Sequence, residues 1–115
     1  MSHPPFAKDF SVRTEQRGAA AVVIPSGELD IATAPALEQE LDRAFDTDSA
    51  RVVLDLRELE FIDSSGLRTL LLARRRADNA GAQFSLVAGD RALQRTLEIA
   101  GIQQIFQWIP AEGMA

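Results

Sequence analysis

The chain has 115 residues, 46% hydrophobic and 25% charged, as expected for one soluble globular domain. It has no cysteine, which excludes disulfides and thiolate metal sites and is compatible with a reducing cytoplasm. The net charge of −5 argues against direct nucleic-acid binding, which depends on basic groups that neutralise phosphates. No apolar run approaches the ~20 residues of a membrane span, and the N-terminus lacks the pattern of a signal peptide.

The spacing of apolar residues predicts an α/β chain with the element order β-β-α-β-α-β-α-β. Strands separated by a helix normally run parallel, whereas the first two strands are expected to form an antiparallel hairpin. The sequence therefore predicts a mixed sheet covered by helices. The expected elements are strands at residues 8–16, 19–24, 51–56 and 82–88, helices capped by Thr33, Asp63 or Ser64, and Asp90, and a last short strand or helical turn within 102–109.

Two positions interrupt the expected strands. Pro25 removes a ladder donor, so we expect the second strand to be interrupted or bulged there, with residues 26–35 forming a connecting loop. Asp55 lies inside an otherwise apolar strand, where either exposure at an edge or a hydrogen-bonded partner would satisfy its carboxylate.

The stretch FIDSSGL, residues 61–67, places two serines where a buried strand turns into a helix. A serine nucleophile requires a base, but the only histidine is His3, in the tail, and the only lysine is Lys8. The glycines of a nucleophile elbow and the glycine and lysine of a phosphate-binding loop are also missing. A receiver-type acceptor at Asp63 lacks a lysine on a late strand. We therefore expect neither an enzyme nor a bound cofactor.

The remaining interpretations are a helix cap and a modification site. Asp63 or Ser64 can cap the helix, but one capping oxygen suffices and leaves Ser65 unexplained. Ser65 would lie in the first turn with its hydroxyl facing outward, where free amides and the helix dipole favour a phosphate. A phosphate adds about −1.5 to −2 charges. Phosphorylation of Ser65 would then break a protein complex and leave the domain folded.

Three segments together resemble an anti-sigma factor antagonist of the STAS domain family. The resemblance covers roughly residues 8–109 and implies a single-domain STAS-like fold, with a mixed four- to five-stranded β-sheet and helices packed mainly on one face. Residues 1–7 are then a flexible N-terminal tail and residues 110–115 a C-terminal tail. The segments are GELDIATAP at residues 27–35, VVLDLRELEFIDSSGLRTLL at 52–71 and GIQQIF at 101–106.

The resemblance also implies a function in transcription regulation. In this family the unmodified antagonist binds an anti-sigma factor that is also an ATP-dependent serine kinase, and this frees the sigma factor. The kinase phosphorylates the second serine of the DSSG motif, here Ser65, which abolishes binding, and a metal-dependent serine phosphatase resets the switch. The protein would be a cytoplasmic substrate without cofactor, metal, nucleic-acid or membrane binding.

Several residues carry over from the family as partner contacts. Glu28 and Asp30 would lie on the neighbouring loop and contact the kinase, unless they are merely solvated acids. Gly66 would leave the approach of the kinase to Ser65 unobstructed. The expected partner-binding residues are Glu28, Asp30, Asp63, Ser64, Gly66, Leu67 and Arg68, of which Arg68 is either a contact or simply an exposed side chain.

The alternative function is a STAS interaction module that is not phosphorylated, within a transporter, a lipid-trafficking complex or a stress-signalling assembly. The family often has a further C-terminal helix, yet only six residues follow Ile109. We therefore expect Ile105, Phe106 and Trp108 to be less covered and to form part of a contact surface.

Overall fold

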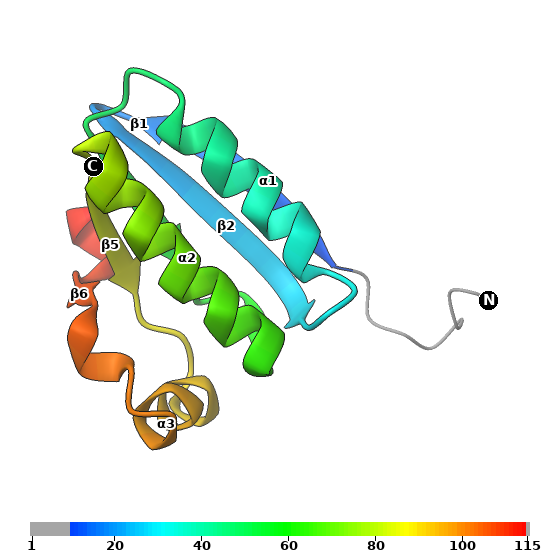
Figure 1. The fold of residues 1–115 in the computed structure, drawn as a ribbon. Coiled ribbons are helices and arrows are strands. Elements are labelled where there is room, and N and C mark those ends of the chain that lie inside the picture. Colours follow the sequence, from blue (N-terminus) through cyan, green and yellow to red (C-terminus); the bar gives the residue numbers. More distant parts are fainter. Residues whose placement is uncertain (1–9, 115) are drawn as a thin grey trace.

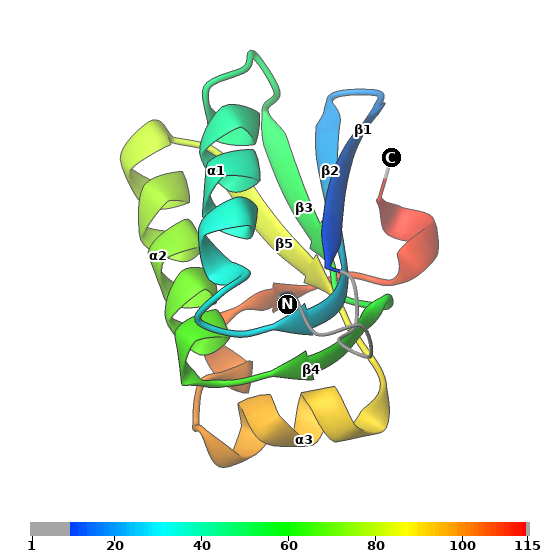
Figure 2. The same ribbon diagram turned by 90° about the vertical axis from the view of Figure 1, so that its right-hand side faces the viewer.

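The computed structural model describes residues 10–114 and has two helices packed against one face of a sheet (Figures 1 and 2). The tail expected at residues 1–7 lies outside the described residues. The strands are β1 (Ser11–Arg17), β2 (Ala20–Leu29), β3 (Arg51–Asp55), β4 (Leu59–Ile62), β5 (Gln83–Val87) and β6 (Gln107–Trp108). The helices are α1 (Ala34–Phe45), α2 (Ser64–Ala80) and α3 (Arg91–Ile99), with 3-10 turns η1 (Gln103–Ile105) and η2 (Ala111–Gly113).

The sheet is mixed, as the sequence predicts. Its order is β1-β2-β3-β5-β6, with β4 pairing with the far end of β2. The β1–β2 pair is antiparallel and all other pairs are parallel. The sheet has six strands in place of the expected four or five. The additional strand is β4, whereas β6 lies within the stretch 102–109 where a last short strand or helical turn was expected.

The main core lies between the sheet and the pair of helices α1 and α2. Leu37 and Leu41 of α1 and Leu70 of α2 are almost fully buried against apolar side chains of β2, β3 and β5. Helix α3 packs against β4 at one end of the sheet (Figure 2). Because burying the apolar stripes of α1 and α2 fixes both helices on the sheet, the start of α2 is held at the end of β4. No helix in residues 10–114 is long and apolar enough to cross a bilayer.

Pro25 does not interrupt β2, which runs unbroken through it and buries it. The N–H of Gly27 donates to Glu58 O on the β4 side, and alternate residues of a strand face the same side, so the Pro25 nitrogen faces that side too. Pairing of β2 with β3 ends at Val23 and pairing with β4 begins at Gly27. Pro25 lies between the two pairings, so the N–H that proline lacks would have had no strand acceptor there. The irregularity lies at Gly27–Glu28 instead.

The opposite face of the sheet has a smaller apolar cluster. Val22, Ile24, Val53 and Val87 are buried there beneath Met114, which is only 3% exposed. Residues 110–114, expected as a tail, thus fold back over the sheet (Figure 2). The guanidinium of Arg51 donates to the carbonyl of Gly113 at 3.2 Å and helps to hold this segment.

The aromatic residues near the C-terminus are more covered than the sequence predicts. Phe106 is buried and packs edge-on between Phe84 and Trp108. Trp108 is half-buried and donates its indole N–H to Gln103 O at 2.8 Å. Only Ile105, at 38% exposure, remains open, because β6 adds this segment to the sheet without a further helix.

Asp55 is buried and hydrogen-bonded to Arg57, rather than exposed at an edge of the sheet. Arg57 donates Nε to Oδ1 at 3.0 Å, a terminal amino group to Oδ2 at 2.8 Å and its backbone N–H to Oδ1 at 3.1 Å. Burial raises the pKa of the Asp55 carboxyl, but the hydrogen bonds and positive charge of Arg57 outweigh burial and lower that pKa below its ordinary value of 3.8.

Candidate functional site

Two segments that are distant in the sequence meet where α2 begins. In the parallel pairing of β2 with β4, Glu28 lies opposite Phe61 and Leu29 opposite Ile62. The backbone N–H of Asp63 then donates to Leu29 O at 3.2 Å. The structure therefore brings GELD beside DSSG, as the resemblance implies, but it places Glu28 within β2 and not on a loop.

Asp63 caps α2. Its Oδ1 accepts hydrogen bonds from the backbone N–H of Ser65 at 2.9 Å and of Gly66 at 3.2 Å. This confirms the expected cap and assigns it to Asp63 rather than Ser64. It also shows that these two first-turn amides are already bonded. The expectation of free amides that could receive a phosphate is therefore wrong.

The two serines differ in exposure. The side chain of Ser64 is exposed, whereas that of Ser65 is half-buried. Ser65 is therefore less open than the expectation of an outward-facing hydroxyl. One turn later, the hydroxyl of buried Thr69 lies 3.2 Å from Ser65 O and 3.0 Å from Glu38 Oε2, which links α2 to α1 beside the serines.

Gly66 faces the core rather than an approaching kinase. An added Cβ would lie 2.5 Å from Ile62 Cγ1 and 2.9 Å from Leu29 Cδ2, and both of these side chains are buried. Gly66 thus lets the first turn of α2 approach the ends of β2 and β4 closely. The next two residues differ in exposure: Leu67 is half-buried against the core, whereas Arg68 is exposed.

Asp30 shapes the turn between β2 and α1. Its Oδ1 accepts hydrogen bonds from the backbone N–H groups of Ala32 at 2.9 Å and Thr33 at 3.1 Å. The Thr33 hydroxyl accepts from Asp30 N–H and donates to Glu28 O, and it makes no capping bond to α1. The expectation that Thr33 caps α1 with its side chain is therefore wrong, because this hydroxyl closes the preceding turn instead.

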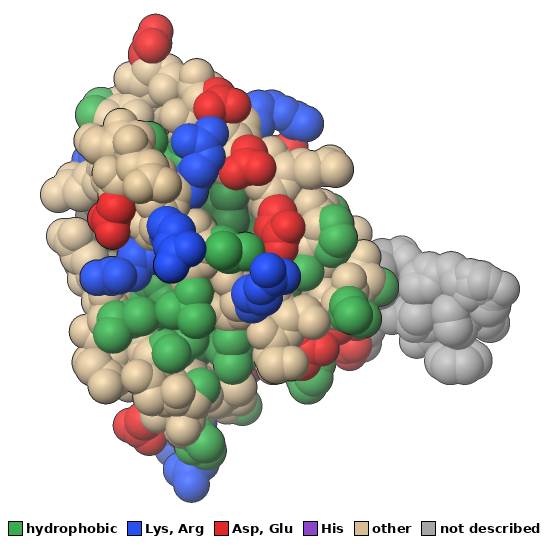
Figure 3. Space-filling view, in the orientation of Figure 1, with side chains coloured by type: hydrophobic (Ala, Val, Ile, Leu, Met, Phe, Trp, Pro, Cys, Tyr) green, Lys and Arg blue, Asp and Glu red, His purple; other side chains and the backbone are tan. Residues whose placement is uncertain are grey.

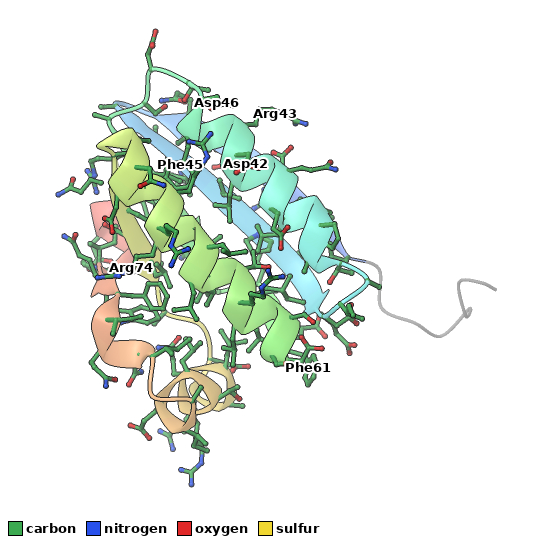
Figure 4. All side chains as sticks on the ribbon, viewed as in Figure 1. Asp42, Arg43, Phe45, Asp46, Phe61 and Arg74 are labelled. Atoms are coloured by element: carbon green, nitrogen blue, oxygen red, sulfur yellow. The ribbon has the colours of Figure 1, made fainter. Side chains whose placement is uncertain are left out.

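Two exposed hydrophobic residues lie beside the same junction, and the sequence interpretation did not single them out. Ile31 is 78% exposed, directly after Asp30, and Phe61 is 47% exposed, opposite Glu28. Figure 4 shows Phe61 beside the start of α2, and in Figure 3 hydrophobic and acidic side chains adjoin at this corner. The only signal in the sequence was an isoleucine in the turn after GELD. The exposure of Phe61 accompanies the register shift between β2 and β4, where the alternation of buried and exposed residues in β4 breaks down.

No group of three or more potential metal ligands of the His, Cys, Asp or Glu type occurs among residues 10–114. The corner around Ser65 presents hydroxyls, carboxylates and two exposed apolar side chains. Exposed apolar side chains with polar groups around them are typical of surfaces that contact another protein.

Comparison with known proteins links this arrangement to a family. The family model described as the STAS domain matches residues 11–115. An anti-sigma-F factor antagonist of Mycobacterium tuberculosis, RsfB, is 28% identical over 98 residues, which cover 85% of this chain and 80% of RsfB. The crystal structure of an anti-sigma factor antagonist from Mycobacterium paratuberculosis has a TM-score of 0.80 and 30% identity, covering 90% of this chain and 87% of that one.

Bacillus SpoIIAA, solved in its phosphorylated form, has a TM-score of 0.66 over 89% of this chain and 94% of its own. Its identity to this chain is 17%, so this likeness concerns the fold alone.

Proposed function

Because the chain belongs to the STAS domain family, we propose that it is an anti-sigma factor antagonist that acts by partner switching. The unmodified protein binds an anti-sigma factor that is also an ATP-dependent serine kinase, and the sigma factor is released. Phosphorylation on Ser65 ends this complex, and a serine phosphatase restores the antagonist. RsfB and the Mycobacterium paratuberculosis protein are anti-sigma factor antagonists, and in this proposal the chain is likewise a cytoplasmic regulator and not an enzyme.

The observation that carries the proposal is the convergence of GELD, DSSG and two exposed hydrophobic residues on one corner. Ile31 and Phe61 offer apolar anchors beside the carboxylate of Glu28 and the serines of α2. Apolar anchors surrounded by polar groups are typical of protein interfaces. A partner surface that fits this corner has an apolar pocket surrounded by basic residues. In the docked complex this surface covers Ser65.

The cap at Asp63 explains why a phosphate would break the complex. Since Asp63 Oδ1 already accepts the amides of Ser65 and Gly66, a phosphate on Ser65 adds charge next to a carboxylate and gains neither amide. In the free protein, water and the exposed Arg68, three residues further along the helix, can solvate it. Under a docked partner that solvation is lost, which costs several kcal/mol, or a factor of about 10² or more in affinity.

The test is phosphorylation with a defined kinase. We would incubate the protein with ATP, magnesium and a candidate anti-sigma kinase, measure the intact mass and map the modified peptide. One phosphate at Ser65 is expected, which Ser65→Ala abolishes and the matched control Ser64→Ala leaves intact. A phosphate confined to Ser64 would refute the assignment of the acceptor.

The half-buried state of Ser65 supports a second candidate, a STAS interaction module of a larger assembly that is never phosphorylated. This module would use the same corner as a constitutive contact. Absence of modification by every cognate kinase, together with stable co-purification of a partner, would favour it.

A further inference from the structure

One edge of the sheet has free backbone groups. Strand β1 pairs with β2 along its whole length, and no other described strand pairs with its outer side (Figure 2). The N–H of Gly27 points toward β4. Every second residue of β2, counted back from Gly27, therefore directs its backbone N–H and C=O groups away from β1. Their partners in β1, which are Val12, Thr14 and Gln16, consequently direct their backbone N–H and C=O groups outward.

The sequence of this edge, SVRTEQR, is complementary to itself in one antiparallel register. When two copies pair around Thr14, Arg13 of each lies opposite Glu15 of the other. A shift by two residues in either direction places Arg13 opposite Arg13, or Glu15 opposite Glu15. A shift by one residue would oppose outward-facing backbone groups to inward-facing ones. Charge and backbone direction thus select the same register.

We propose that β1 is a dimerisation edge, to which a second copy of this chain adds its own β1 antiparallel around Thr14. The two sheets then become continuous. Backbone hydrogen bonds form at Val12, Thr14 and Gln16, and Arg13 pairs with Glu15 of the second copy twice by symmetry.

The charged side chains of β1 make ion pairs within the chain, which a second copy would have to share or replace. Arg13 lies 3.3 Å from Glu15 and its guanidinium also donates to both oxygens of Glu58, while Arg17 lies 2.7 Å from Glu15. These contacts hold the three β1 side chains on one face of the strand. On the other face the Thr14 hydroxyl donates to Glu40 of α1 at 2.8 Å, so α1 lies alongside the edge.

The contact is small, since it involves one strand of seven residues. It belongs to the class of weak, concentration-dependent interfaces rather than obligate ones. It does not depend on phosphorylation of Ser65, because the residues that form it lie on β1 and not on α2.

The test is sedimentation velocity of the purified chain over a concentration series. The unmodified protein should show a concentration-dependent dimer. Arg13→Glu and Glu15→Arg should each weaken self-association about tenfold or more, because each variant opposes like charges at two symmetric positions. An equimolar mixture of the two variants should recover a heterodimer, since every cross-strand contact then joins opposite charges.

Two further variants separate charge and backbone effects. Arg95→Glu makes the same charge change on exposed α3 and should leave dimerisation unchanged. Thr14→Pro removes an outward N–H without altering charge or pairing with β2, and should abolish the dimer while circular dichroism shows a folded protein. The proposal is overturned by a monomer at every concentration, by a dimer that survives Thr14→Pro, or by variants that fail to associate when mixed.

Discussion

The close approach of α2 to the sheet at Gly66 gives a quantitative prediction for Gly66→Ala. Alanine gains up to about 1 kcal/mol over glycine in helix propensity. Its Cβ, however, would lie 2.5 Å from Ile62 Cγ1 and 2.9 Å from Leu29 Cδ2, in a site where both neighbours are buried. Such overpacking costs about 1–3 kcal/mol. Because all three contacts lie under 3.0 Å and both neighbours must shift, we expect a cost of about 2–3 kcal/mol and hence a net loss of about 1–2 kcal/mol in the free energy of unfolding.

Urea unfolding followed by the fluorescence of Trp108, the only tryptophan, measures this loss. The matched control is Gly113→Ala, where the added Cβ would lie 3.5 Å from Pro110, and where we expect a change within about 0.5 kcal/mol. Ile62→Ala should cost less in the Gly66→Ala background than in the wild type, because it removes the clashing atom. A Gly66→Ala protein as stable as the wild type would refute the reasoning.

The remaining predictions concern binding and pH. Ser65→Ala should stay folded and bind the kinase in calorimetry, whereas Ser65→Asp should stay folded and bind at least about tenfold more weakly; equal binding would contradict the interface. Ile31→Ser should weaken that binding with little change in unfolding midpoint, since Ile31 is 78% exposed; Phe61→Ser should also weaken it, with a modest fall in midpoint because Phe61 is only 47% exposed. The lowered pKa of Asp55 means that its pair with Arg57 stabilises the fold above about pH 4 and ceases to do so as pH falls through the folded-state pKa. The free energy of unfolding should therefore fall less between neutral pH and acid pH in Asp55→Asn than in the wild type.

Local features of the fold could be predicted from the sequence because they depend on neighbouring residues. Apolar spacing located α1, α2 and α3, and Asp63 and Asp90 cap helices as expected. The DSSG and GELD segments together indicated the family. Each of these signals lies within one helical turn or one strand, where side chains act on their own backbone.

The sequence by itself determined the order of the elements other than β4, the place where α2 begins and the pair of serines at its start. The structure added β4 and chose Asp63 over Ser64 as the cap of α2. Only the tertiary structure decided that Pro25 lies where β2 changes partners, that Gly66 faces buried side chains, and that Ser65 is half-buried. It also decided that Ile31 and Phe61 stand exposed at the same corner. These properties follow from the pairing of strands distant in the chain, since exposure and contact depend on what the rest of the fold places beside each residue.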